Sequence, residues 1–277
     1  MKQKFPMLIL LALIVLMCAP AAHATPCSIE RSAVQYGAGS AEVAGISSPK
    51  ISINRPVVIL IHGGGWRSGH RGYMCYQNLD AVKAGYVSVN IDYPLATTTM
   101  PGWRMELDAV ERAINWTQAN IAQYGGDPRH VSIIGSSAGA NLAYLASMEI
   151  NAASPGVVTA VVGVSAPTDL TAFRQDGIQA GLQNAAAQYL GCPTYAVCSN
   201  ALERAASPVF APVSNCARYY VANGVAETMV PPIQATRFAQ RLAGQGCAVT
   251  TNLYAGSVHA DWASTKVDAL AWLAVNR

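Results

Sequence analysis

Ser137 lies in the pentapeptide Gly-Ser-Ser-Ala-Gly at positions 135–139, directly after the apolar run Val131–Ile134. A serine raised on a sharp turn between a strand and a helix can act as a nucleophile if a base takes its proton. Only one histidine, His259, follows Ser137 in the chain. In the chain order serine, acid, histidine, His259 is therefore the candidate base.

A second chemical signal lies upstream of the serine. The strand-like run Val57–Ile61 is followed by the sequence His-Gly-Gly-Gly-Trp at positions 62–66. Backbone amides in such a glycine-rich turn can donate hydrogen bonds to an oxyanion. The Gly-x-Ser-x-Gly pattern alone arises by chance in roughly one chain in ten of this length, so the interpretation depends on both motifs occurring in this order. We expect His62 to brace the turn rather than to transfer protons.

The segment after the serine has a role of its own. Ala138 begins a helix-like run that extends to Ile150. The unpaired amides and the dipole at the start of a helix favour negative charge. We therefore expect the amide of Ala138 to be one donor to the oxyanion.

These motifs resemble those of the α/β-hydrolase carboxylesterases, near their hormone-sensitive-lipase-like and feruloyl-esterase-like branches. The resemblance extends from about Arg55 to Trp272 and includes Gly-Gly-Asp-Pro at 125–128 and the segment at 223–231. It implies the α/β-hydrolase fold, with a mostly parallel sheet flanked by helices. It also implies that the amides of Gly64 and Gly65 complete the oxyanion hole and that an acid stands at the position of Glu227.

The acid must lie between the serine and the histidine. Glu227 follows the strand-like run Ala217–Ala222, next to the strand that feeds the histidine loop, so its carboxylate should reach the imidazole and fix its tautomer. Asp169, at the end of the preceding strand, is the alternative. The acidic residues in this interval are Glu149, Asp169, Asp176, Glu203 and Glu227.

The resulting hypothesis is a serine carboxylesterase that hydrolyses short to medium acyl esters. His259 takes the proton of Ser137, the serine attacks the ester carbonyl, and water then releases the acid from an acyl-enzyme. This chemistry needs no metal and no organic cofactor. The expected partner is a small-molecule ester.

Three departures from the family patterns leave the subfamily and the natural substrate open. Ser136 replaces a common Asp, Tyr-Pro-Leu at 93–95 replaces Tyr-Arg-Leu, and the acid is Glu. The alternatives among enzymes are a polysaccharide-linked acetyl or feruloyl esterase and an amide hydrolase resembling kynurenine formamidase. The alternative from another class is a catalytically inactive, cholinesterase-like binding module.

Apolar runs that alternate with helical periodicity predict an α/β fold with a parallel sheet that positions these residues. Helices are expected around 107–121, at 138–150 and at 267–275. The irregular stretch 168–213 should form a small lid or pocket wall, with a surface excursion as the alternative. The residues expected to line the pocket are Trp66, Tyr93 and Trp262. The predicted strands are Val57–Ile61, Val87–Ile91, Val131–Gly135, Val157–Val164, Ala217–Ala222 and Ala248–Tyr254.

The first 24 residues have the pattern of a secretory signal peptide. Lys2 and Lys4 precede the apolar run Met7–Met17, and alanines at 22 and 24 form a cleavage pattern. A membrane span would need about 20 apolar residues. We therefore expect an exported protein, periplasmic or secreted, with a single domain at 25–277 and no membrane span in the mature chain.

The overall charge gives no indication of a polyanionic partner. The 277 residues include 18 Lys and Arg and 15 Asp and Glu, and removal of the two lysines in the signal peptide leaves 16 basic against 15 acidic residues, a net charge of +1. Such a charge balance does not indicate that the protein binds nucleic acid or an anionic membrane surface. The sequence gives no indication of the oligomeric state.

Seven cysteines become six once Cys18 leaves with the signal peptide. An even number in an exported chain indicates disulfides. Two cysteines each precede a predicted strand, and the starts of neighbouring parallel strands lie within bridging distance. Two others flank a short proline-containing loop, and the last two would tie down the N-terminal arm. The predicted pairs are, in this order, Cys216–Cys247, Cys192–Cys198 and Cys27–Cys75.

Overall fold

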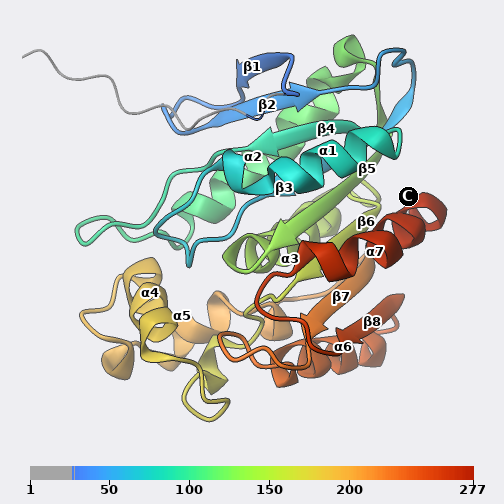
Figure 1. Ribbon diagram of the computed structural model, residues 1–277. Helices are drawn as coiled ribbons and strands as arrows, with labels where there is room; N and C mark the ends of the chain where they lie inside the picture. Colours follow the sequence, from blue (N-terminus) through green and yellow to red (C-terminus); the bar gives the residue numbers. More distant parts are fainter. Residues whose placement is uncertain (1–26, 28) are drawn as a thin grey trace, which may run out of the picture.

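The computed structural model describes residue 27 and residues 29–277, and the predicted signal peptide at 1–24 lies outside them. The strands are β1 Ser32–Gln35, β2 Val43–Ser47, β3 Arg55–Ile61, β4 Val87–Ile91, β5 Gly126–Ser136, β6 Ala160–Val164, β7 Arg218–Gly224 and β8 Val249–Tyr254. They form one sheet in the order β1-β2-β4-β3-β5-β6-β7-β8 (Figure 1). β2 pairs antiparallel with β1 and β4, and all the other pairs are parallel.

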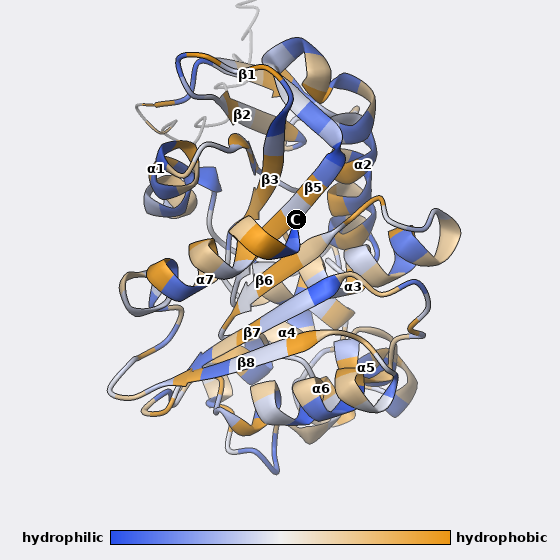
Figure 2. Cartoon of the chain, turned by 90° about the vertical axis from the view of Figure 1, so that its right-hand side faces the viewer, coloured by the Kyte–Doolittle hydropathy of each residue, from blue (hydrophilic) through white to orange (hydrophobic). Residues whose placement is uncertain are grey.

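Helices cover both faces of this sheet. The α-helices are α1 Cys75–Lys83, α2 Met105–Asn120, α3 Ala138–Ala153, α4 Ala180–Leu190, α5 Asn200–Ala205, α6 Ile233–Gly244 and α7 Trp262–Asn276. Helices α1 and α7 lie on one face, and α2, α3 and α6 lie on the other (Figure 2). Alternate side chains of β3 enter the two cores, because successive residues of a strand point to opposite faces: Val58 and Leu60 pack with the α1 and α7 side, and Ile59 packs with the other.

The mostly parallel sheet between helices confirms the α/β-hydrolase fold class. The six predicted strands correspond to β3 through β8. The strand predicted at 157–164 begins only at Ala160, because residues 157–159 belong to the turn that follows α3. The edge strands β1 and β2 were not predicted, since β1 has only four residues and an alternating, half-exposed pattern.

The stretch 168–213 consists mainly of short helices. It contains α4, α5 and the 3₁₀ turns Leu170–Ala172, Tyr195–Val197 and Pro208–Phe210. Helix α4 is fixed to the loop that follows β3, because the rings of Tyr189 and Trp66 stack at 4.7 Å. Arg67 adds bonds from its guanidinium to the Gln188 side chain, at 3.3 Å, and to the Gly181 carbonyl, at 3.5 Å.

The part of the chain that the structure describes holds three disulfides, two of which join segments that are far apart in the sequence. Cys27–Cys75 ties the N-terminal arm to the start of α1, Cys216–Cys247 ties the start of β7 to that of β8, and Cys192–Cys198 closes a loop. The pairs are the three that were predicted from the sequence. Their sequence separations are 48, 31 and 6 residues.

His62 is buried at the end of β3, where the sheet meets the glycine-rich loop. Its ring stacks on Tyr93 at 4.3 Å, and its Nδ1 lies 2.7 Å from the carbonyl oxygen of Gly63. The Tyr93 hydroxyl donates to the His62 carbonyl at 2.8 Å. Burial lowers the pKa of His62 to about 4, against the opposing effect of the Gly63 hydrogen bond. The imidazole is therefore neutral at pH 7 and braces the turn.

The disulfide loop lengths set an expected order of stabilities. A disulfide restricts the unfolded chain more when it closes a longer loop, so replacing Cys216 and Cys247 by alanine should lower the free energy of unfolding by about 4 kcal/mol. Replacing Cys192 and Cys198 should lower it by only about 2 kcal/mol. Urea unfolding of the two double variants measures both values, and equal losses would contradict this reasoning.

The buried His62 should make stability depend on pH. In the unfolded chain the imidazole binds a proton near pH 6.5, whereas in the folded protein it does so only near pH 4. Above pH 6.5 the imidazole is neutral in both states, and the free energy of unfolding does not depend on its titration. As the pH falls from 6.5 towards 4, only the unfolded chain binds the proton, and the free energy of unfolding falls by about 3 kcal/mol. The loss should be absent in His62→Phe, which keeps the stacking. Parallel pH profiles of urea unfolding for the two proteins would refute the effect.

Candidate active site

Ser137 occupies a strained turn between β5 and α3. Its φ is 53° and its ψ −122°, in the left-handed half of backbone space that non-glycine residues rarely adopt. The turn is tight because neighbouring backbones touch: a Cβ at Gly135 would come within 2.6 Å of the Gly139 carbonyl oxygen. The two flanking glycines therefore permit the elbow that lifts the serine side chain into the cavity.

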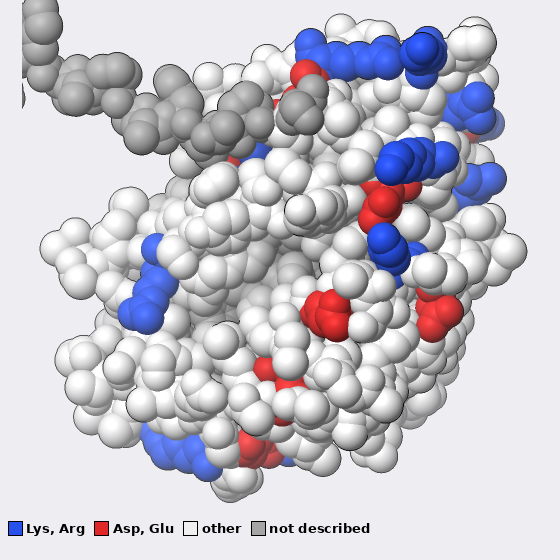
Figure 3. Space-filling model, viewed as in Figure 1, with Lys and Arg blue, Asp and Glu red and all other residues white. Residues whose placement is uncertain are grey.

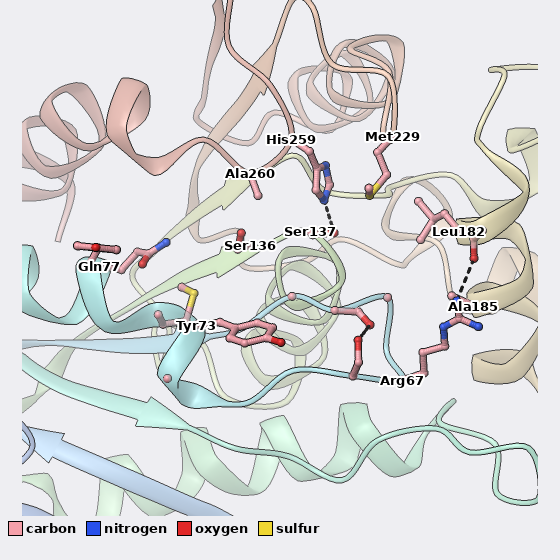
Figure 4. Close-up of a pocket in the computed structure, with 18 of the residues that line it drawn as sticks. Arg67, Tyr73, Gln77, Ser136, Ser137, Leu182, Ala185, Met229, His259 and Ala260 are labelled. Carbon is pink, nitrogen blue, oxygen red and sulfur yellow. Dashed lines mark hydrogen bonds between the residues drawn. The ribbon is translucent and has the colours of Figure 1, made fainter. Parts of the chain in front are cut away.

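His259 comes from the loop between β8 and α7 and lies beside the serine. Its Nε2 is 2.9 Å from Oγ of Ser137 (Figure 4). The amide of Ala260 donates to the Ser165 hydroxyl at 3.0 Å, which fixes the loop to the end of β6. The imidazole can accept the hydroxyl proton without a change of geometry.

Glu227 lies on the other side of the imidazole. Its Oε2 is 2.9 Å from Nδ1 of His259. Its Oε1 accepts the backbone amides of Met229 at 2.7 Å and Val230 at 3.1 Å, and the side chain is only 1% exposed. Asp169, the alternative acid, instead lies 3.2 Å from the guanidinium of Arg237. The structure thus brings Glu227, and not Asp169, into line with the serine and the histidine.

The surroundings of Glu227 keep it ionised. Burial acts to raise the pKa of its carboxyl group, but the hydrogen bond and charge of His259, together with the amides of Val230 and Met229, hold the pKa below its ordinary value. A carboxylate at Nδ1 stabilises an imidazolium and leaves Nε2 free to face the serine.

The glycine-rich loop after β3 lies next to Ser137. Gly64 and Gly65 have φ of 129° and 58°, which glycine adopts without strain. Among the described residues, neither of their amides donates a hydrogen bond. Ala138 opens α3, so its amide has no partner within the helix. A Cβ at Gly63 would lie 3.0 Å from the Cβ of Ser137, which shows how closely the loop approaches the serine.

A cavity of about 780 Å³ opens above Ser137 and His259. Figure 3 shows this face of the molecule hollowed, with mostly uncharged side chains around the hollow. Figure 4 shows Leu182 and Ala185 of α4 to one side of Ser137 and Gln77 of α1 to the other. The stretch 168–213 thus supplies one wall of the cavity through α4.

The three aromatic residues expected in the pocket lie elsewhere. Trp66 is fully buried between α4 and α3, and its indole nitrogen donates to the side chain of Asn141 at 3.3 Å. Tyr93 is stacked beneath the loop on His62. Trp262 packs against the sheet and bonds Asp80 at 3.0 Å. The prediction that these three residues line the pocket is therefore wrong. Each has a large aromatic side chain, and burial of its area in the core stabilises the fold.

The other wall was not identified from the sequence. It comes from the 3₁₀ turn Arg71–Met74 and the first turn of α1, which place Tyr73, Tyr76 and Gln77 on the cavity. No chemical motif marks this segment. The available signal was Cys75, since the predicted disulfide to Cys27 ties the segment that follows the glycine-rich loop to the N-terminal arm.

Within residue 27 and residues 29–277, no group of three or more His, Cys, Asp or Glu side chains is placed to hold a metal ion. None of the helices in this part of the chain is long and apolar enough to cross a membrane.

Comparison with known sequences gives relatives among esterases. The BD-FAE family model matches residues 46–242. Esterase LipQ of Mycobacterium tuberculosis (strain ATCC 25618 / H37Rv) is 31% identical in an alignment of 205 residues that covers 71% of this chain and 48% of that protein. Esterase LipC of the same strain is 28% identical in an alignment of 232 residues that covers 77% of this chain and 55% of that protein. The chain spans about half the length of these two relatives.

Solved structures share the fold at lower sequence identity. EstE1, a thermophilic carboxylesterase cloned from a metagenomic library, is 21% identical, with a TM-score of 0.72 and coverage of 84% of this chain and 82% of that one. A truncated carbohydrate esterase from gut microbiota is 19% identical, with a TM-score of 0.75 and coverage of 90% and 97%. The family match covers well over half of the sequence, and the chain therefore belongs to the BD-FAE family, a hormone-sensitive-lipase-like esterase family of the α/β-hydrolase fold.

Proposed function

We propose that the protein is a serine carboxylesterase that hydrolyses short to medium acyl esters. The observation that carries this proposal is the hydrogen-bonded chain from Glu227 through His259 to Ser137, with 2.9 Å at each of the two steps to the imidazole. The esterase names of the relatives agree with it.

In the proposed reaction, His259 takes the proton of Ser137 as the serine oxygen attacks the ester carbonyl. Glu227 holds the imidazole in the tautomer that has its proton on Nδ1 and stabilises the charge that forms. The amides of Gly64, Gly65 and Ala138 then stabilise the oxyanion. The imidazolium protonates the leaving alcohol, and the same histidine activates the water that releases the acid from Ser137.

His62 contributes no charge to this site at neutral pH, because burial lowers its pKa to about 4. In the proposed reaction the oxyanion is therefore stabilised by oriented backbone amides alone.

The cavity and the cysteines support the finer parts of the proposal. Leu182, Ala185 and Met229 offer an apolar surface of modest size next to the serine, which suits a short or medium acyl chain. Three disulfides suit an exported protein, because thiols stay reduced in the cytosol.

The nucleophile is tested by Ser137→Ala. Loss of the nucleophile should lower kcat for 4-nitrophenyl butyrate by about 10⁶-fold, and the melting temperature should stay close to that of the wild type. Ser147→Ala, on the same helix but outside the cavity, is the matched control and should keep full activity. Undiminished turnover by Ser137→Ala would sink the proposal.

The acid is tested by a pair of amide variants. Glu227→Gln removes the negative charge at Nδ1 and should lower kcat on the order of 10³- to 10⁴-fold with a small change in KM. Asp169→Asn changes the other candidate acid and should leave kcat within a few-fold of the wild type. A larger loss in Asp169→Asn than in Glu227→Gln would reverse the assignment.

A further inference from the structure

Asn141 is a fully buried polar residue in the first turns of α3, four residues after Ser137. Its backbone amide donates to the Ser137 carbonyl at 3.1 Å, so the helix fixes the two residues relative to each other. Asn141 is not among the residues that line the cavity, and it takes no part in the proposed reaction. A buried carboxamide is tolerated where its hydrogen-bonding groups have partners, so the partners of Asn141 indicate what it does.

The side chain of Asn141 joins three separate segments to α3. Its Oδ1 accepts the indole N–H of Trp66 at 3.3 Å. Its Nδ2 donates to the carbonyl of Pro167, in the loop after β6, at 2.9 Å and to that of Ala206, at the end of α5, at 3.1 Å. A primary amide has one oxygen and two N–H groups, and here each of them has a partner. Exchange of the oxygen and the nitrogen would break all three bonds, so the network fixes the orientation of the amide.

Trp66, the donor to Asn141, has an unfavourable backbone conformation. Its φ is 60°, in the left-handed region that non-glycine residues rarely adopt. The ring stacks on Tyr189 at 4.7 Å, the carbonyl accepts the amide of Ala96 at 2.8 Å, and the indole bonds Asn141. A strained conformation persists only where such contacts determine it, and strain of this kind is concentrated at functional sites. The bond to Asn141 is therefore one of the contacts that hold the loop in its strained form.

The strained residue directly follows Gly64 and Gly65, the proposed oxyanion donors. The torsion angles at Trp66 therefore determine how the loop leaves these two glycines. A Cβ at Gly65 would lie only 3.2 Å from the Cβ of Ala185, so α4 confines the loop, and Asn141 joins it to α3. A misplacement of about 1 Å in a catalytic group can cost roughly a hundredfold in rate.

The other two bonds of Asn141 extend the connection to the rest of the cavity. Pro167 lies close in sequence to Ser165, whose hydroxyl accepts the amide of Ala260 in the histidine loop. Ala206 belongs to the stretch 168–213, which supplies the α4 wall of the cavity. One carboxamide thus ties the glycine-rich loop, the loop after β6 and this stretch to the same helix.

We propose that Asn141 is a positioning residue for the oxyanion hole, which acts through Trp66 to hold the glycine-rich loop where the oxyanion forms. The inference rests on the proposed esterase function and adds to it a residue that touches neither the substrate nor the reacting atoms. The oxyanion exists in the transition state and not in the bound ester. A positioning role of this kind therefore changes kcat and leaves KM nearly constant, whereas a purely structural role changes neither.

The first test removes all three bonds of the carboxamide. Asn141→Leu keeps the size and branching of the side chain and should lower kcat for 4-nitrophenyl butyrate by roughly ten- to a hundredfold, with KM within about threefold of the wild type. Asn151→Leu is the matched control, because Asn151 is also buried in α3 and bonds the carbonyl and amide of Val158 at 2.8 and 2.9 Å. Both variants should melt at a lower temperature, and Asn151→Leu should keep the wild-type kcat.

A second variant isolates the bond to the loop. Trp66→Phe removes the indole N–H and retains a ring that can stack on Tyr189, and it should lower kcat by roughly three- to tenfold. Trp272→Phe removes a similar indole bond, to Thr250 at 3.0 Å, and should keep the wild-type kcat. The double variant of Asn141→Leu and Trp66→Phe should lose less than the product of the two single losses, because both act through one bond.

A transition-state analogue distinguishes positioning from a general loss of stability. With 1,1,1-trifluoro-2-hexanone, the Ser137 oxygen bonds the ketone carbon, His259 takes the hydroxyl proton, and the carbonyl oxygen becomes the oxyanion. The inhibition constant should rise in Asn141→Leu and in Trp66→Phe by about the factor by which kcat falls. It should stay at the wild-type value in Asn151→Leu and Trp272→Phe.

The outcomes separate this inference from the proposed function. A kcat and an inhibition constant in Trp66→Phe within about 1.5-fold of the wild type would overturn the inference, whether or not Asn141→Leu folds. An equal loss of kcat in Asn141→Leu and Asn151→Leu would overturn it as well, since only one of these residues contacts the glycine-rich loop. Absence of ester hydrolysis by the wild-type protein would instead contradict the esterase function, and the inference with it, before any substitution is made.

Discussion

The site depends on one close approach of two backbones. The glycine-rich loop after β3 passes so near to the start of α3 that a Cβ at Gly139 would come within 2.3 Å of the carbonyl oxygens of Ile61 and His62. The same loop reaches the serine itself, since a Cβ at Gly63 would lie 3.0 Å from the Cβ of Ser137. Because both segments are extensions of neighbouring parallel strands, β3 and β5, their separation is set by the register of the sheet itself. The pairing of β3 with β5 therefore fixes the position of the glycine-rich loop relative to Ser137.

Glu227 and His259 lie at the same edge of the sheet but are joined to it more loosely. Glu227 follows β7, and His259 follows β8, so each is carried on a loop. The backbone amides of Met229 and Val230 fix the carboxylate, and the Ser165 hydroxyl fixes the histidine loop. Local hydrogen bonds thus fix these two loops, whereas close backbone contact fixes the turn at Ser137.

The sequence was sufficient to predict the strands, and the residues at their ends, where an apolar run is followed by a residue that could do chemistry. Strands β3 through β8 are apolar runs next to turns, and Ser137, His259 and Glu227 each follow one of them, so chain order alone brought them to one edge. It was insufficient where burial depends on tertiary packing. Trp66 and Tyr93 adjoin motif residues but turn into the core, because their large rings fill the space under the loop. Tyr76 and Gln77, on α1, carry no motif, and only the packing of α1 beside the loop brings them to the cavity.

The covalent link between Cys27 and Cys75 has a consequence for how the protein matures. Cys75 is itself part of the cavity wall, so oxidation of this pair fixes a surface that faces the same cavity as Ser137. Chains that fold under reducing conditions would have the nucleophile and its base, which involve no cysteine, but would lack the fixed wall. Material prepared in a reducing cytoplasm would therefore differ from the oxidised protein at this wall of the cavity, while the contacts among Ser137, His259 and Glu227 would be the same.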